Sequence, residues 1–97
     1  MNMDIAIAAS RIMAEESGNM NDICIHFMQA GFPVVCGRSA VLLNRFCPEL
    51  RFSEISSSDG EKYNVIHGFP IEPVIAKFKD RHRLLVDDDH IRIINVQ

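Results

Sequence analysis

The sequence has no tryptophan, a single tyrosine and only three cysteines among its 97 residues. The cysteines Cys24, Cys36 and Cys47 form no Cys-x-x-Cys pair, which excludes a zinc ribbon and a thioredoxin-type redox motif. Unpaired cysteines are typical of a reducing compartment. Residues 1–4 also lack the basic region of a secretory signal. We therefore expect a cytoplasmic or nuclear protein.

Long apolar runs are missing as well, since none approaches the ~18 residues that a membrane-spanning helix requires. We expect no membrane partner. Positive charge is not in excess, because ten Lys and Arg residues stand against thirteen Asp and Glu residues. This balance excludes a broad phosphate-binding surface but allows a local basic patch. With 47% hydrophobic and 24% charged residues, the chain has the composition of a globular protein, and residues 1–97 are expected to form one domain.

Four stretches carry apolar residues at the spacing of three and four that predicts helices. They cover residues 4–17, 21–30, 39–46 and 71–79. Asn21 and Ser39 are candidate N-caps. Pro48 is expected to end the third helix near Phe46, because the residue before a proline avoids the helical region.

The first predicted helix has a narrow apolar stripe that contains Ile5, Ala9 and Ile12. We expect this stripe to pack on the core of the chain. Homodimerisation through residues 4–17 is the alternative, because a second copy can cover the same stripe.

The rest of the chain predicts short extended segments and loops. Residues 33–36 and 63–66 are expected to be extended, residues 53–60 to form a polar loop, and residues 84–86 and 91–96 to form a β-hairpin around an acidic turn. No internal repeat is evident.

This order of elements predicts an α+β fold: a small winged-helix-like domain with four helices and a C-terminal β-hairpin wing. The N-terminal helix, within residues 1–18, is expected to pack on or extend a core formed by residues 21–96. The predicted core residues are Ile12, Ile23, Phe27, Leu43, Phe46, Val74, Phe78, Leu85 and Ile93.

The sharpest enzymatic hypothesis is a cysteine nucleophile. Cys36 precedes a predicted helix, whose N-terminus would lower the thiol pKa. His67 and one of Asp87, Asp88 and Asp89 follow in the order of a papain-like triad. Because four histidines and thirteen acidic residues offer such triplets by chance, we expect no catalytic residues.

Metal binding has less support. Cys24 and His26 lie two residues apart, and on a helix they would point in different directions. The run of Asp87, Asp88 and Asp89 lacks the glycine and the closing glutamate of an EF-hand loop. We expect neither a metal site nor a cofactor.

One charge cluster stands out at the end of the last predicted helix and the start of the hairpin. It consists of Lys77, Lys79, Arg81, His82 and Arg83. Cations at a helix C-terminus are favoured by the helix dipole. In a winged helix this region also meets nucleic-acid backbone, so the cluster is our candidate site for a nucleic acid or a protein partner.

Three motifs resemble the LOTUS domain family, also called OST-HTH domains. Residues 42–48 (LLNRFCP) are similar to the family's L-x-x-F-x-P stretch, residues 67–69 (HGF) to its Tyr-Gly-aromatic element, and residues 84–87 (LLVD) with residues 91–93 (IRI) to its closing wing. The resemblance covers about residues 22–96.

The resemblance implies a non-catalytic winged-helix module of RNA-granule and germline proteins. Extended members of the family bind the C-terminal RecA-like domain of the DEAD-box helicase Vasa, and minimal members have been linked to RNA, including G-rich RNA. This chain differs by an additional helix over residues 4–17, a longer polar insertion over residues 53–60 and the absence of a helix after the predicted wing.

We therefore expect a non-catalytic adaptor that mediates protein–protein interaction in an RNA-linked complex, with a DEAD-box helicase as the kind of partner and with homodimerisation as a further hypothesis. Direct RNA or DNA binding through the basic cluster is the first alternative. A small papain-like cysteine hydrolase that uses Cys36 is the second.

Overall fold

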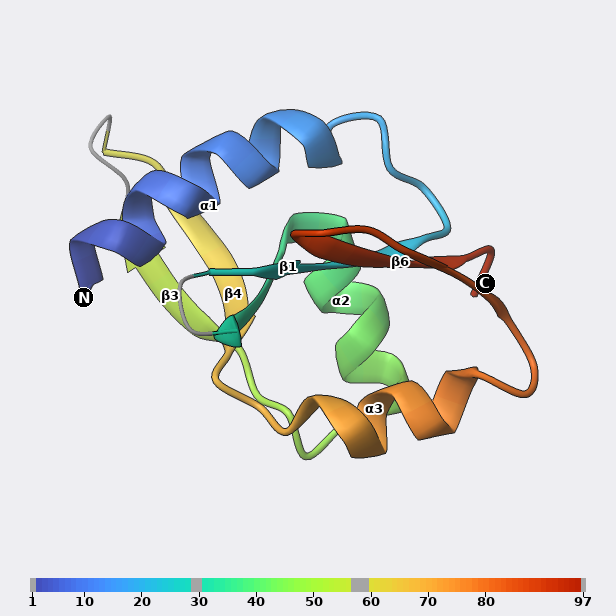
Figure 1. Ribbon diagram of the computed structural model, residues 1–97. Coiled ribbons are helices and arrows are strands. Elements are labelled where there is room, and N and C mark those ends of the chain that lie inside the picture. Colours follow the sequence, from blue (N-terminus) through green and yellow to red (C-terminus); the bar gives the residue numbers. More distant parts are fainter. Residues whose placement is uncertain (1, 29–30, 57–59, 97) are drawn as a thin grey trace.

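The computed structural model describes residues 2–28, 31–56 and 60–96. Within them, each of three helices is followed by two strands, and the six strands form one antiparallel sheet in the order β3-β4-β2-β1-β6-β5 (Figure 1). The elements are α1 (Asn2–Glu16), β1 (Ile23–Phe27), β2 (Pro33–Cys36), α2 (Gly37–Phe46), β3 (Ser53–Ser56), β4 (Lys62–His67), α3 (Ile71–Phe78), β5 (Arg83–Val86) and β6 (His90–Ile94).

The predicted winged helix with four helices is wrong. The second predicted helix, residues 21–30, contains strand β1 instead, and residues 29–30 lie outside the described residues. Ile23 and Phe27 match the helical period, but Ile23, Ile25 and Phe27 also alternate at the strand period. The strand forms because β2 and β6 pair with β1 on both sides.

The predicted hairpin forms, but it is not a wing. Strand β6 pairs along β1, with Ile23 opposite Ile93, so the hairpin is part of the main sheet. The predicted polar loop, residues 53–60, contains strand β3, which pairs with β4. Residues 57–59 of that loop lie outside the described residues.

The other predicted elements are confirmed. The helices expected over residues 4–17, 39–46 and 71–79 are α1, α2 and α3, and the extended segments at residues 33–36 and 63–66 lie in β2 and β4. Helix α2 ends at Phe46, as Pro48 predicts.

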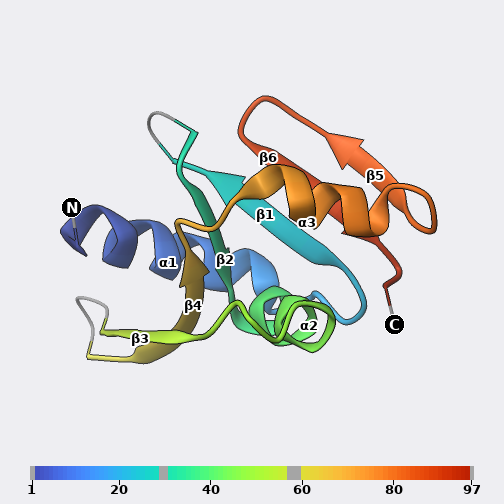
Figure 2. The ribbon, with the colours of Figure 1, turned by 90° about the horizontal axis from the view of Figure 1, so that it is seen from below.

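The helices cover both faces of the sheet at its centre. Helix α1 lies on one face, and α2 and α3 lie on the other (Figures 1 and 2). Alternate residues of β2 therefore enter two separate cores: Val35 joins the cluster under α2 and α3, while Val34 and Cys36 join the cluster under α1. All four residues of β2 are buried as a result.

The stripe on α1 packs inside the chain. Ala9 and Ile12 are both fully buried against Val34, Cys36 and Val65. This confirms core packing for this part of the stripe and leaves these two residues unavailable to a second copy. The side chain of Ile5 lies outside the described residues.

Six of the nine predicted core residues are buried: Ile12, Ile23, Leu43, Val74, Phe78 and Ile93. Phe27 is half-buried. Two predictions are wrong, because Phe46 is 37% exposed and Leu85 is 49% exposed. Phe46 is the last residue of α2, and Leu85 lies in the outermost strand.

The structure contains a repeat that is not evident in the sequence. The three hairpins begin at Ile23, Ser53 and Arg83, at intervals of 30 residues. The second strand of each hairpin is followed by a residue with positive φ, namely Gly37, Gly68 and Asn95. The first two hairpins meet where β2 pairs with β4.

Candidate functional site

The predicted basic cluster is divided by the fold. Lys77 donates a hydrogen bond through Nζ to the backbone oxygen of Phe46 at 2.7 Å, so it caps the C-terminus of α2. The ring of His82 packs at 5.7 Å from that of Phe78 and 6.3 Å from that of Phe46, measured between centroids. These two members of the cluster therefore hold α2, α3 and the following turn together.

Lys77 is exposed as well, and so are the other three cations of the cluster, Lys79, Arg81 and Arg83. They form no ion pair with any residue that the structure describes. Lys79 caps the end of α3, and Arg83 begins β5. The structure thus places three free cations beside the outer edge of the sheet.

Cys36 does not have the environment of a nucleophile. It is fully buried, and this burial, with a smaller contribution from the charge of Glu16, raises its pKa to about 12. In the sheet Cys36 lies opposite Val65, whereas His67 lies opposite Val34. The hairpin that carries the acidic run is separated from β2 by β1.

The other two thiols are also buried, and burial raises the pKa of Cys24 and of Cys47. No group of three or more potential metal ligands occurs among the described residues. The geometry does not support the cysteine-hydrolase alternative.

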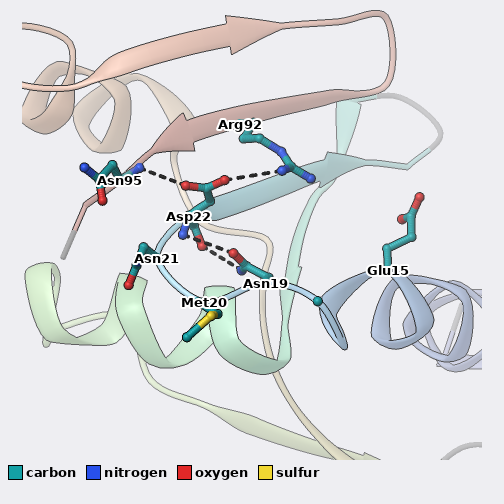
Figure 3. A pocket seen from close by; sticks show the side chains of 8 residues that line it. Glu15, Asn19, Met20, Asn21, Asp22, Arg92 and Asn95 are labelled. Carbon is teal, nitrogen blue, oxygen red and sulfur yellow. Dashed lines mark hydrogen bonds and ion pairs between the residues drawn. The ribbon is translucent and has the colours of Figure 1, made fainter.

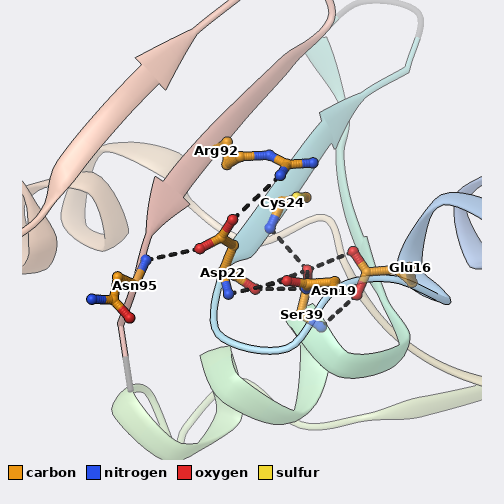
Figure 4. Close-up of polar contacts among 7 residues, drawn as sticks. All are labelled: Glu16, Asn19, Asp22, Cys24, Ser39, Arg92 and Asn95. Carbon is orange, nitrogen blue, oxygen red and sulfur yellow. Dashed lines mark hydrogen bonds and ion pairs between the residues drawn. The ribbon is translucent and has the colours of Figure 1, made fainter.

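A buried polar network joins the end of α1 to the start of α2 (Figure 4). The carboxylate of Glu16, only 5% exposed, accepts hydrogen bonds from the backbone N–H of Ser39 at 2.8 Å and from its hydroxyl at 2.7 Å. The Ser39 Oγ accepts hydrogen bonds from the backbone N–H of Cys24 and from the amide of Asn19. A carboxylate at a helix N-terminus is favoured by the dipole, so Glu16 takes the place of a side-chain N-cap.

A polar pocket of about 460 Å³ lies beside this corner of the molecule (Figure 3). Asp22 accepts hydrogen bonds there from the guanidinium of Arg92 at 3.3 Å and from the backbone N–H of Asn95 at 2.8 Å. No buried side-chain nitrogen or oxygen of the described residues lacks a partner. The polar groups of the pocket therefore close the corner of the fold, and we assign no ligand to it.

The sheet has two open edges, at β3 and at β5, and the edge at β5 is the apolar one. Figure 2 shows β5 as the last strand of the sheet, with no element beyond it. Leu85 is 49% exposed and Val86 is 74% exposed. The site was not predicted from the sequence, because Leu85 was expected in the core. Apolar alternation marks a strand but does not say whether the strand lies at an edge.

The hydrogen-bond pattern gives the orientation of the β5 backbone. The N–H of Asp87 donates to the oxygen of His90 at 2.9 Å, so Asp87 and His90 form a hydrogen-bonded pair. Because such pairs alternate along an antiparallel ladder, Arg83 and Leu85 also bond toward β6. The N–H and C=O groups of Leu84 and Val86 therefore point away from the sheet.

Comparisons of the chain with models of protein families, with curated proteins and with solved structures found no match. Of the helices in the described part of the chain, none combines the length and apolar character needed to cross a bilayer.

Proposed function

We propose that this chain is a non-catalytic protein-recognition module that binds an extended segment along the free edge of β5. The observation that carries the proposal is the contrast between the two edges of the sheet. Edge strand β3 has three exposed polar residues and a half-buried Ile55. Edge strand β5 has the exposed apolar residues Leu85 and Val86 instead. Proteins usually avoid apolar residues at an open sheet edge, because such an edge pairs with other chains, so their presence at β5 favours a binding role.

Strand addition fits the chemistry of this edge. The outward N–H and C=O groups of Leu84 and Val86 can form main-chain hydrogen bonds with an extended segment. These bonds supply affinity that does not depend on the side chains of the segment. Successive side chains of β5 point to opposite faces of the sheet. Leu85 and Val86 therefore offer one apolar contact on each face, and these contacts select for an apolar partner strand.

The test uses short peptides selected from a phage-displayed library on the immobilised chain. We expect apolar, extended sequences whose affinity falls roughly tenfold or more with Val86→Lys, because the substitution places a charge in the new interface. Ser56→Lys is the matched control, since Ser56 is exposed on the opposite edge strand at the repeat position that corresponds to Val86. Binding should also slow hydrogen exchange at the amides of Leu84 and Val86. Selected peptides that leave both amides unprotected would contradict the proposal.

Contact with RNA is a second candidate, favoured by the three free cations Lys79, Arg81 and Arg83 next to this edge. The wider hypothesis of an RNA-linked adaptor that binds a DEAD-box helicase rests on the LOTUS resemblance, and the winged helix that the resemblance implied is absent. We therefore propose RNA contact only through these cations.

Fluorescence anisotropy of labelled single-stranded RNA tests this candidate at low and moderate salt. Arg81→Ala should weaken binding to all sequences to a similar degree and reduce the slope of affinity against salt. Arg51→Ala, at an exposed residue outside the cluster, serves as the control. Equal affinity of the Arg81→Ala variant and the unmodified chain would remove the cluster from consideration.

A further inference from the structure

The two ends of β5 are flanked by charges of opposite sign, at equal distances from its centre. The three residues before Leu84 are Arg81, His82 and Arg83, and the three residues after Val86 are Asp87, Asp88 and Asp89. Leu85 is the centre of this arrangement. A segment that is basic at one end and acidic at the other is complementary to an antiparallel copy of itself.

We infer that the segment bound at the β5 edge is β5 of a second copy of this chain, paired antiparallel with Leu85 opposite Leu85 of the other copy. The inference rests on the proposed function, because it uses the same edge and names its partner. Pairing in this register joins two six-stranded sheets into one continuous sheet about a twofold axis.

The backbone of β5 is suited to this register. The residues whose backbone groups face outward are Leu84 and Val86. In this register the N–H and C=O of Leu84 form hydrogen bonds with the C=O and N–H of Val86 in the other copy. Twofold symmetry repeats the pair, and the two Leu85 residues lie between them as a non-hydrogen-bonded pair. The side chains of such a pair approach closely, which favours contact between the two leucines.

The side chains match along the same register. Leu84 lies opposite Val86, so an apolar residue meets an apolar residue. Arg83 lies opposite Asp87, and both project from the face of the sheet that carries Leu85. Opposite charges at directly opposed positions stabilise a strand pair. Beyond them, the exposed Arg81 of one copy approaches the acidic turn of the other.

Arg83 and Asp87 are available for such a contact. Both are exposed, and neither forms an ion pair with another described residue. The opposite edge differs, because Glu54 of β3 is already paired with Lys62 at 3.6 Å. Only a partner whose charges run in the opposite direction neutralises both ends of β5, and a second copy meets this requirement by symmetry.

Charge reversal at the two ends of β5 tests the inference by sedimentation equilibrium of the full chain. Arg83→Asp places two pairs of like charges in the dimer, and Asp87→Arg does the same with the opposite sign. Each should weaken dimerisation roughly tenfold at low salt, because two exposed pairs change from attraction to repulsion. A one-to-one mixture of the two variants restores both attractive pairs and should dimerise, as should the variant that carries both substitutions.

Arg51→Asp and Glu49→Arg are the matched controls, since both residues are exposed and lie in the segment after α2. They should leave dimerisation unchanged. Circular dichroism of each variant checks that the fold is retained, which the exposure of the substituted residues predicts.

The outcomes separate this inference from the proposed function. A chain that stays monomeric up to ~1 mM, where association is worth only about 4 kcal/mol, while selected peptides still bind β5, overturns the inference alone. A dimer that both charge reversals leave unchanged uses another surface and also overturns it. A monomeric chain for which no peptide protects the amides of Leu84 and Val86 contradicts both.

Discussion

At the scale of single residues, the hydroxyl of Ser39 connects three elements of the fold. It donates to Glu16 of α1, accepts from the backbone N–H of Cys24 in β1 and belongs to the first turn of α2. We expect Ser39→Ala to lower the free energy of unfolding by about 3 kcal/mol, because it leaves a buried N–H without a partner and weakens the contacts of a buried carboxylate. Urea denaturation measures the change.

Ser53→Ala is the control for this prediction, since Ser53 is exposed in β3. Its effect should stay within about 0.5 kcal/mol. A cost for Ser39→Ala no larger than that of Ser53→Ala would show that the network contributes little to stability.

His26 gives the fold a dependence on pH. Burial and the neighbouring His90 lower its pKa below the ordinary value of 6.5, against the opposing charge of Glu15. At a pH between the pKa values of the folded and the unfolded state, His26 is therefore protonated in the unfolded chain and neutral in the folded chain. The stabilisation is present above pH 6.5 and is lost as the pH falls.

We expect His26→Gln to flatten the decline in the free energy of unfolding between about pH 7 and pH 5, where an ordinary histidine titrates. Denaturation curves across this range measure it. His67→Gln, at an exposed residue, is the comparison. An unchanged slope in the His26→Gln variant would assign the pH dependence to other groups.

At the scale of elements, the junction between β2 and α2 depends on Gly37. Its φ of +59° is one that residues with a Cβ rarely adopt, and a Cβ added there would lie 2.8 Å from the sulfur of Met13. Gly37→Ala should therefore lower the free energy of unfolding by about 2–3 kcal/mol, through backbone strain and the shift of the Met13 side chain that the added Cβ requires. Thermal or urea unfolding measures it.

Gly60→Ala separates the two contributions. Gly60 also has positive φ, +88°, but nothing lies within 4 Å of the added Cβ. It should cost about 1–2 kcal/mol, from strain alone. Equal costs for the two variants would mean that the contact between Met13 and Gly37 does not constrain the junction.

The elements themselves differ in how far the sequence predicts them. Helix α3 and strand β2 were predictable because proline and apolar spacing mark them locally. Strand β1 was not, since its residues fit both periods and the pairing with β2 and β6 decides between them. Strand β3 is polar and exposed, so no apolar pattern distinguishes it from a loop.

At the scale of the whole molecule, the order of the strands decides what the site is. The basic cluster could be predicted from the sequence. The contacts that Lys77 and His82 make with Phe46 of α2 could not, because they join segments distant in the sequence. The exposed edge could not be predicted either. It arises because β6 pairs with β1, which is distant in the sequence, and this pairing leaves β5 at the edge of the sheet.

Native-state hydrogen exchange distinguishes this sheet from a domain with a peripheral wing. The N–H of Phe27 donates to the oxygen of Asp89, so the alternating ladder directs the amides of Ile91 and Ile93 toward β1, inside the sheet. We expect these two amides to exchange among the slowest in the chain. The outward amides of Leu84 and Val86 should exchange fast at concentrations below dimerisation. If the whole hairpin opened as one unit well below the free energy of global unfolding, β6 would behave as a wing and the integrated sheet would be contradicted.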